Sequence, residues 1–299
     1  VIGNARDPQI DTDGSLISVS LNSGSSEGPT DDLRIKPDIA GNGTGLFSTY
    51  ESADDAYNTI SGTSMSSPNV AGSLMLLQQH YQNVSGKFMK AATLKGLALH
   101  TADDGGQTGP DAQFGWGLMN TKKAAETIID DGLNSLILES TINQGETLTF
   151  TVKSDETNPL FASISWTDAP GEVNTQLNSS TPALVNDLDI RVSNTTETFE
   201  PWRLTAVNRS GKGDNLVDPF ERIDVDAASG EYTITVTHKG TLLDGSQDCS
   251  LIITVVSYDM RISSAELSKE VCSDEEIVFD FIYKQNTNGI TTNLSFENL

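Results

Sequence analysis

The sequence predicts a chain of two unlike parts, helical segments joined by glycine-rich loops over residues 1–130 and an all-β sandwich over residues 131–258. In the first part, apolar residues recur at helical spacing over residues 68–81, 87–100 and 121–129. In the second part, polar and apolar residues alternate in short runs between turn residues. Helices and strands repeat their side-chain directions every 3.6 and every two residues, so the change of period marks a domain boundary.

The first helical segment, residues 68–81 (PNVAGSLMLLQQHY), is apolar nearly all round. This pattern is typical of a helix buried inside a domain. Pro68 suits the first turn of a helix, where a backbone N–H has no acceptor within the helix. Between the second and third helices lie a turn cluster at residues 103–106 (DDGG) and the triplet Gly-Trp-Gly at 115–117, which predict an irregular loop.

The second part contains runs with the alternating pattern of strands. These are residues 147–152, 160–166, 188–192, 232–237 and 250–256. Several such runs separated by turn residues predict a β-sandwich or jelly roll. A further strand pattern at 277–283 indicates the start of a third module, for which the chain supplies only about 40 residues, too few to bury a core alone.

The charge balance restricts the kinds of partner that the chain can bind. It has 18 Lys and Arg against 42 Asp and Glu in 299 residues, a net charge of −24. The densest basic stretches, residues 87–95 and 122–123, have ordinary helix-face spacing, so we expect no nucleic-acid partner. No apolar run approaches the ~20 residues of a membrane span. Nothing in the composition indicates the oligomeric state.

The chain has only two cysteines, Cys249 and Cys272, which fall in different predicted domains. This excludes a disulfide framework and a metal site of the cysteine type. Cys249 lies in a strand-like run, so we expect it to be a small buried side chain.

Residues 62–72 (GTSMSSPNVAG) place a serine at the mouth of the first predicted helix. Gly62 permits a sharp turn just before it. N–H groups at a helix N-terminus favour negative charge, which develops on the carbonyl oxygen in acyl transfer. Ser64 is therefore a candidate nucleophile whose own N–H could stabilise the oxyanion. If only Gly62, Thr63 and Ser64 are considered, helix capping is the alternative interpretation.

The whole string 62–72 resembles the serine motif of the subtilisin-like serine proteases, the subtilase family. Five further segments are similar to family segments in the same order along the chain: residues 1–5 (VIGNA), 25–30 (SSEGPT), 34–39 (RIKPDI), 95–104 (KGLALHTADD) and 109–120 (GPDAQFGWGLMN).

The resemblance implies that residues 1–131 are the C-terminal part of an α/β subtilisin-like catalytic domain. It implies a secreted bacterial serine endopeptidase that acts on protein or peptide substrates and needs no cofactor for catalysis. Ser64 would be the nucleophile and a backbone oxyanion donor, with Gly62, Thr63 and Met65 as positioning residues. In the family the catalytic Asp, the catalytic His and an oxyanion Asn precede the serine. We expect them upstream of this chain, which alone is then expected to be inactive.

No histidine of the chain is expected to replace the missing base. His80 lies sixteen residues along the same predicted helix as the candidate serine, about 24 Å away at ~1.5 Å per residue. His100 and His238 are expected to be packing or surface residues. Asn4 and Asn42 have Gly-Asn contexts like that of the family's oxyanion Asn. We interpret both as loop residues outside the catalytic set.

Residues 132–258 resemble the jelly-roll domain, similar to the P domain of proprotein convertases, that follows the protease domain in one branch of subtilases. Segments 163–171, 184–190 and 230–236 carry this resemblance. Residues 259–299 are similar to the beginning of an Ig-like β-module. The predicted fold is therefore a partial α/β subtilisin-like domain, a jelly-roll or β-sandwich domain and the start of an Ig-like module.

Asn186, Asp187 and Asp189 are candidate ligands of a structural Ca²⁺ ion. In a strand the two aspartates point to the same face, and Ca²⁺ prefers carboxylate and amide oxygens. The alternative is a solvated acidic strand edge without a metal.

A second function also fits the sequence. The serine motif could be a relic in a non-catalytic secreted protein whose sandwiches bind glycan or peptide. A catalytic Asp and His upstream of the chain would exclude this alternative.

Overall fold

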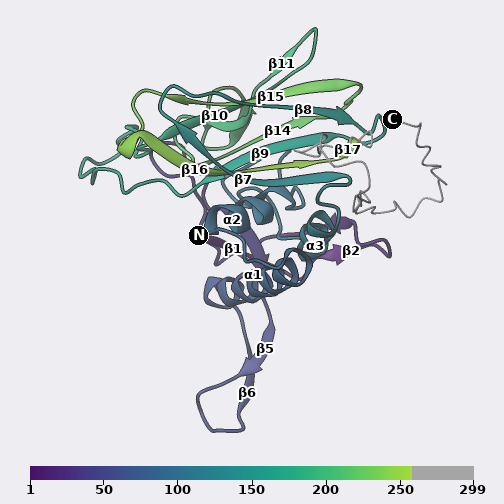
Figure 1. Cartoon of the computed structure of the whole chain (residues 1–299). Helices are drawn as coiled ribbons and strands as arrows, with labels where there is room; N and C mark the ends of the chain where they lie inside the picture. The colour runs from purple at the N-terminus through teal and green to yellow at the C-terminus, as the bar shows by residue number, and fades with distance from the viewer. Residues whose placement is uncertain (258–299) are drawn as a thin grey trace, which may run out of the picture. The chain divides into compact units, whose positions relative to one another are not determined.

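Three α-helices, one short 3₁₀ helix (Leu243–Gly245) and seventeen strands lie in residues 1–257, the part of the chain that the computed structural model describes (Figure 1). These residues form one compact unit. The predicted Ig-like module at 259–299 and Cys272 lie outside the described residues. None of the three described helices has the length and apolar content that a membrane span requires.

The N-terminal half is built around a short parallel strand pair. β1 (Ile2–Ala5) pairs with β4 (Ile39–Asn42). Two small hairpins accompany the pair, β2 (Gln9–Ile10) with β3 (Leu16–Ser18) and β5 (Leu46–Thr49) with β6 (Tyr57–Ile60). Figure 1 shows the second hairpin projecting away from the helices.

The three helices agree with the three segments of helical period. They are α1 (Thr63–Ser85), α2 (Ala91–His100) and α3 (Thr121–Ile129). α1 begins before Pro68, so the proline lies in its second turn. α3 has its N-terminus capped, because the Asn120 side chain accepts a hydrogen bond from the Lys123 N–H.

The prediction that the first helix is buried all round is wrong for the described chain. Val70, Leu77 and Tyr81 of α1 are buried, but Met75 and Leu76 are 74% and 69% exposed. Within residues 1–257, α1 packs on β1, β4, α2 and α3 with one side only. A helix that is apolar all round has no periodicity to indicate which face its neighbours cover.

The C-terminal half is a pair of antiparallel sheets. The five-stranded sheet has the order β11-β10-β15-β8-β17 and the four-stranded sheet the order β14-β9-β16-β7. The strands are β7 (Ser135–Asn143), β8 (Leu148–Ser154), β9 (Leu160–Trp166), β10 (Asp187–Ser193), β11 (Thr198–Phe199), β14 (Phe220–Val225), β15 (Glu231–Lys239), β16 (Ser246–Thr254) and β17 (Val256–Ser257). A separate hairpin pairs β12 (Trp202–Ala206) with β13 (Arg209–Lys212).

One apolar core joins the inner faces of the two sheets. Trp166 and Ile164 of the four-stranded sheet pack in the same cluster as Ile190 and Ile234 of the five-stranded sheet, and all four are fully buried. Cys249 is buried there too, as predicted, and burial raises the pKa of its thiol to about 11. The alternating pattern therefore does mark strands whose apolar faces meet in a sandwich.

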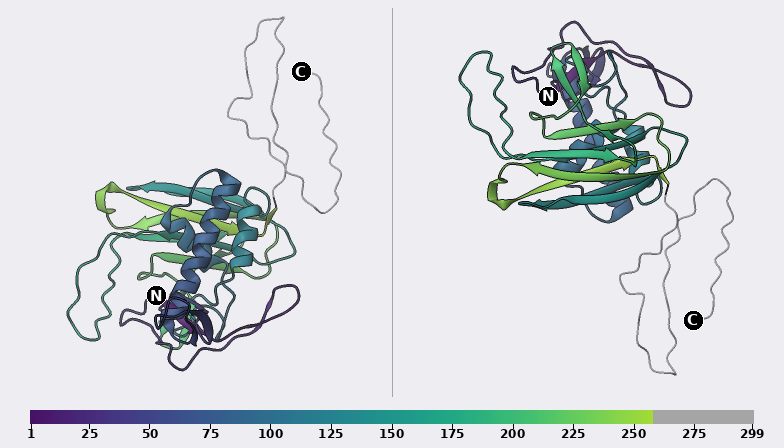
Figure 2. Two further views of the ribbon diagram at one scale, coloured as in Figure 1. Left: turned by 90° about the horizontal axis from the view of Figure 1, so that it is seen from below. Right: turned by 90° about the horizontal axis from the view of Figure 1, so that it is seen from above.

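The outer face of the four-stranded sheet is covered by α2, and Figure 2 shows the helices gathered on this side. Successive side chains of β9 alternate, so Ser163 faces α2 while Ile164 enters the sandwich core. His100 of α2 is hydrogen-bonded through Nδ1 to Ser163 Oγ (2.8 Å) and through Nε2 to Thr254 Oγ1 (3.0 Å). Burial lowers the pKa of His100 to about 3, so this histidine is a neutral packing residue at neutral pH.

The helical half and the sandwich also share apolar cores. Ile35, Val70 and Trp116 cluster with Phe220 of β14, and Leu97 clusters with Ile252 of β16. The predicted domain boundary at 131/132 falls between α3 and β7, within a unit that these cores hold together. The limits of the predicted domains stay a prediction.

Candidate active site

Ser64 is an exposed residue in the first turn of α1. The residue at the N-cap is Gly62, and no side chain caps the helix. The helix-capping interpretation of Ser64 is therefore wrong. N–H groups of a first turn have no acceptor within the helix, so the Ser64 N–H remains available beside its hydroxyl. These are the two groups that an acyl-transfer nucleophile with a backbone oxyanion donor requires.

The first turn of α1 is fastened to the ends of β1 and β4. The Gly62 N–H donates to the Gly43 carbonyl (2.8 Å). The Ser66 hydroxyl, which is fully buried, lies 2.7 Å from the carbonyl oxygens of Gly3 in β1 and Gly41 in β4. Ser64 thus lies between two anchored neighbours on one turn, which fixes the position of its backbone.

Close packing makes glycine necessary at Gly41 in β4 and at Gly43 just after it, rather than at Gly62. A Cβ on Gly43 would lie 2.6 Å from the Gly62 carbonyl oxygen and from Ser66 Cβ, and one on Gly41 would lie 2.5 Å from Val70 Cγ2. Gly62 itself has extended backbone with φ 161°, and a Cβ there would meet nothing closer than 3.7 Å. The chain does bend at Gly62, as predicted, but neither its φ nor its surroundings require a glycine there.

Sequence reasoning missed Ser66, Gly41 and Gly43 as supports of the candidate nucleophile. The Gly-Asn-Gly run at 41–43 was the available signal, because paired glycines often mark a close approach of two backbones. The sequence does not indicate that the first turn of α1 is the element that packs on these glycines, because that contact is made in the tertiary fold.

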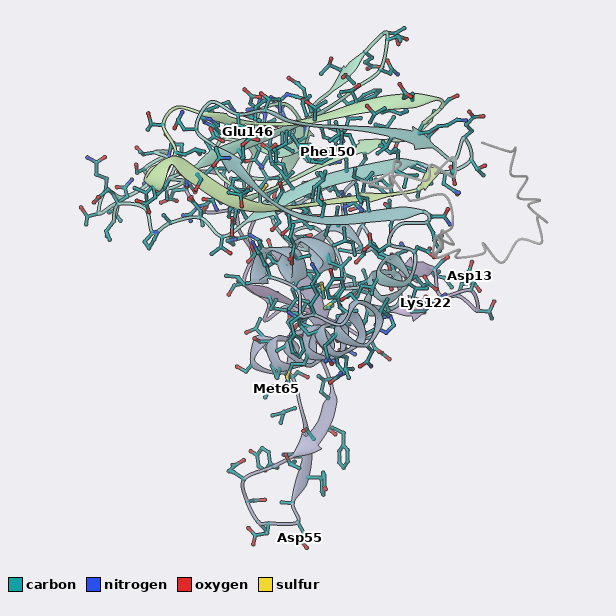
Figure 3. All side chains as sticks on the ribbon, viewed as in Figure 1. Asp13, Asp55, Met65, Lys122, Glu146 and Phe150 are labelled. Carbon is teal, nitrogen blue, oxygen red and sulfur yellow. The ribbon has the colours of Figure 1, made fainter. Side chains whose placement is uncertain are left out.

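Thr63 and Met65 flank the serine and are half-buried. Figure 3 shows Met65 at the start of α1, close to where the β5–β6 hairpin leaves the body, with Asp55 at the far tip of that hairpin. Their roles in positioning the nucleophile stay predictions.

Asn4 and Asn42 are strand residues, so their interpretation as loop residues is wrong. Asn42 is the last residue of β4 and Asn4 the last but one of β1, and Asn4 pairs with Gly41 and Asn42 with Ala5. The buried Asn4 amide lies 3.0 Å from Thr44 Oγ1. Asn42 donates to Asp7 Oδ1 and accepts from the Thr44 N–H.

In the described part of the chain, none of the histidines is hydrogen-bonded to Ser64. His80 lies further along α1, as predicted. His100 is held between α2 and the sandwich, and the Nε2 atom of His238 accepts a hydrogen bond from the Gly145 N–H (2.7 Å). None of these three histidines is therefore a candidate general base for Ser64.

Ser66→Ala is expected to destabilise the chain by about 1–3 kcal/mol, because it removes a buried hydroxyl from two carbonyl oxygens. Ser73→Ala is the matched control, since the Ser73 hydroxyl also donates to a carbonyl, that of Asn69, but at the helix surface. Denaturant unfolding of both variants measures the difference. Equal effects would show that the Ser66 hydroxyl does not fasten the turn.

A buried aspartate of the sandwich supports the strand on which this turn rests. Asp218, in the segment before β14, accepts the Ile35 N–H at 3.1 and 3.3 Å with its two oxygens, and Asn215 Nδ2 at 3.1 Å. Ile35 precedes β4 by a few residues. Burial raises the pKa of Asp218 to about 7. The ionised form of Asp218, which holds this segment, therefore lowers the free energy of unfolding at neutral pH relative to the protonated form.

The raised pKa of Asp218 predicts a pH dependence of stability. A carboxyl with a raised pKa in the folded chain contributes stability that is complete below its usual value of 3.8 and is lost as pH rises through about 7. Asp218→Asn removes this loss. Its stability relative to the wild type should improve by on the order of 2–4 kcal/mol between pH 4 and pH 8.

Urea unfolding at both pH values measures this change. Asp224→Asn serves as the control, because Arg222 lowers the pKa of Asp224 against the effect of its burial, so its stability relative to the wild type should change little between pH 4 and pH 8. If both variants shift in the same direction with pH, Asp218 does not carry the dependence.

The predicted calcium ligands are not brought together as a metal site. Asp187 and Asp189 do share a face of β10, but the Lys239 ammonium contacts both. The buried Asn186 side chain donates to Gln247 Oε1 (2.7 Å) and accepts the Leu243 N–H (2.8 Å). Among residues 1–257, no group of three or more His, Cys, Asp or Glu side chains is arranged to hold a metal. As they stand, these three residues do not fit a Ca²⁺ ion.

The segment that contains the candidate site is similar to known proteins. Residues 15–117 match the profile of the subtilase family. The PII-type proteinase of Lactococcus lactis subsp. cremoris is 43% identical over 75 residues, which is 25% of this chain and 4% of that protein. The minor extracellular protease Vpr of Bacillus subtilis is 32% identical over 140 residues, 44% of this chain and 17% of Vpr. The C5a peptidase of Streptococcus pyogenes is 32% identical over 152 residues, 46% of this chain and 13% of the peptidase.

This chain thus spans less than a fifth of the length of each of these relatives. Among solved structures, the periplasmic lysozyme inhibitor PliG of Aeromonas hydrophila aligns with 41% of this chain and with 87% of the PliG chain. The sequence identity is 14% and the TM-score is 0.21, a likeness too weak to support an argument. The relatives named above are proteinases or peptidases, and the matched segment contains the serine turn. Residues 15–117 are therefore similar to the subtilase family, and Ser64 lies inside the matched segment.

Proposed function

We propose that this chain is part of a secreted bacterial serine endopeptidase in which Ser64 is the nucleophile. The observation that carries the proposal is the exposed Ser64 on an anchored helix N-terminus, inside a segment that matches the subtilase family. One relative is named an extracellular protease, which supports export.

In the proposed reaction, Ser64 Oγ attacks the carbonyl carbon of a peptide bond and loses its proton to a histidine, which an aspartate orients. We place this histidine, the aspartate and an oxyanion asparagine in sequence that precedes Val1 in a longer protein. The Ser64 N–H donates to the oxyanion, and the N-terminal end of α1 adds favourable electrostatics for the negative charge. The substrates are proteins or peptides, and the chemistry needs no metal from the residues named here.

The direct test is labelling of the complete protein with a fluorophosphonate, which reacts with an activated serine. We expect covalent label on the peptide that contains Ser64 and none on the Ser64→Ala variant. A folded complete protein that takes up no label would favour the alternative, a binding protein that carries a relic serine motif. Label on a different serine would place the nucleophile elsewhere.

A further inference from the structure

A group of five charged side chains lies at one end of the five-stranded sheet. Lys239 ends β15 and is paired with Asp187 at the start of β10. Its ammonium lies 2.6 Å from Asp189 Oδ1, 3.6 Å from Asp214 Oδ2 and 3.7 Å from Asp187 Oδ2. Arg191 of β10 forms ion pairs with Asp189 and Asp214. Three carboxylates from two segments of the chain therefore converge on one ammonium, with a guanidinium beside it.

The group is partly withdrawn from solvent. The Asp189 side chain is only 6% exposed, and Lys239 is 37% exposed. Behind it, the fully buried Glu221 accepts the Ile190 N–H at 2.9 Å with Oε2, while Oε1 has no partner within the described residues. Burial raises the pKa of Glu221 well above its usual value. One carboxylate oxygen of Asp187 is likewise buried without a partner.

This arrangement has the donor set of a hard-cation site, but a side chain already fills its centre. Carboxylate oxygens are the ligands that Ca²⁺ prefers, at 2.3–2.6 Å. A metal bound at the position of the Lys239 ammonium would have to displace it, because two cations cannot share one point among three carboxylates. Partly buried carboxylates with no cation between them would repel one another strongly.

We propose that Lys239 is a built-in cation of this sandwich and occupies the place that a divalent metal would otherwise take. The sandwich is then stable without Ca²⁺, and removal of the ammonium turns Asp187, Asp189 and Asp214 into a vacant cation site. This inference is independent of the proposed protease activity, since the group belongs to the sandwich and not to the turn of Ser64.

The test is thermal unfolding of the chain in EDTA and in about 10 mM CaCl₂, a concentration that saturates even weak calcium sites. The wild type should have the same melting temperature in both. Lys239→Gln should melt at least about 5 °C lower in EDTA, because it leaves Asp187 without a cation and Asp189 and Asp214 with Arg191 alone. Calcium should restore most of that loss.

Two control variants make the result specific. Lys239→Arg retains a cation and should stay insensitive to calcium. Lys153→Gln removes an exposed lysine from β8 of the same sheet, so any calcium response there would report only the lower net charge.

Calorimetric titration of CaCl₂ into the folded wild type decides the proposal even if Lys239→Gln does not fold. Heat of binding with a rise in the wild-type melting temperature would overturn it, since a metal would then compete successfully with Lys239. A folded Lys239→Gln variant that calcium fails to stabilise would also overturn it.

Discussion

Ser64→Ala is expected to reduce the peptidase activity of the complete protein by on the order of 10⁴–10⁶-fold, the scale that removal of a serine nucleophile has in enzymes of this mechanism. The loss should appear in kcat, because the hydroxyl forms its bond only as the reaction proceeds. The substitution should leave the free energy of unfolding within ~0.5 kcal/mol, since Ser64 is exposed and no side chain depends on it for a cap.

Ser73→Ala is the control for this experiment. It removes a serine hydroxyl from the same helix, about two and a half turns away, and should keep full activity. Hydrolysis of a casein or peptide substrate by the purified complete protein measures both variants. Activity of Ser64→Ala close to that of Ser73→Ala would mean that Ser64 is not the nucleophile.

Trp166→Ala should destabilise residues 1–257 by about 3–5 kcal/mol, the range for loss of a buried aromatic side chain. Trp166 is fully buried in the shared core of the two sheets, and its indole N–H donates to the Asn186 carbonyl (3.0 Å). Such a loss is a large part of the 5–15 kcal/mol that usually stabilises a folded domain. The Trp166 carbonyl also accepts the Lys95 ammonium of α2 (3.2 Å), so we expect α2 to lose structure together with the sandwich.

Guanidinium unfolding followed by far-ultraviolet and near-ultraviolet circular dichroism tests both parts of this prediction. Leu177→Ala, in an exposed loop where the side chain is 93% exposed, is the control and should change stability by less than ~0.5 kcal/mol. Separate unfolding transitions for the helices and the strands would contradict the inference that they unfold as one unit.

Element types were predictable because each depends on a local period. The three helical segments and the main alternating runs correspond to α1, α2, α3 and to strands of the two sheets. The exposure of α1 was not predictable, since its pattern shows no polar face. Met75 and Leu76 are as apolar as Leu77, yet only Leu77 is buried. Which of them is covered depends on the neighbours that the chain brings to the helix.

The candidate site divides in the same way. Ser64 could be found from its motif, because a nucleophile at a helix N-terminus needs contiguous residues. Its supports could not, because the Ser66 hydroxyl and the glycines at 41 and 43 act on segments that are distant in sequence. Asn4 and Asn42 were misread for the related reason that a short parallel pair leaves little alternation in either strand.

By itself, then, the sequence determined the order of a helical part and a β part, the place of the candidate nucleophile and the acidic character of the chain. Only the tertiary structure decided what the charged and polar residues between these parts do. Asp187 and Asp189 share a strand face that can be predicted from a period of two, but their cation comes from β15, fifty residues after Asp189. A local sequence pattern indicates which way a side chain points. The partner that it contacts can lie far away in the sequence, and only folding of the chain brings the two together.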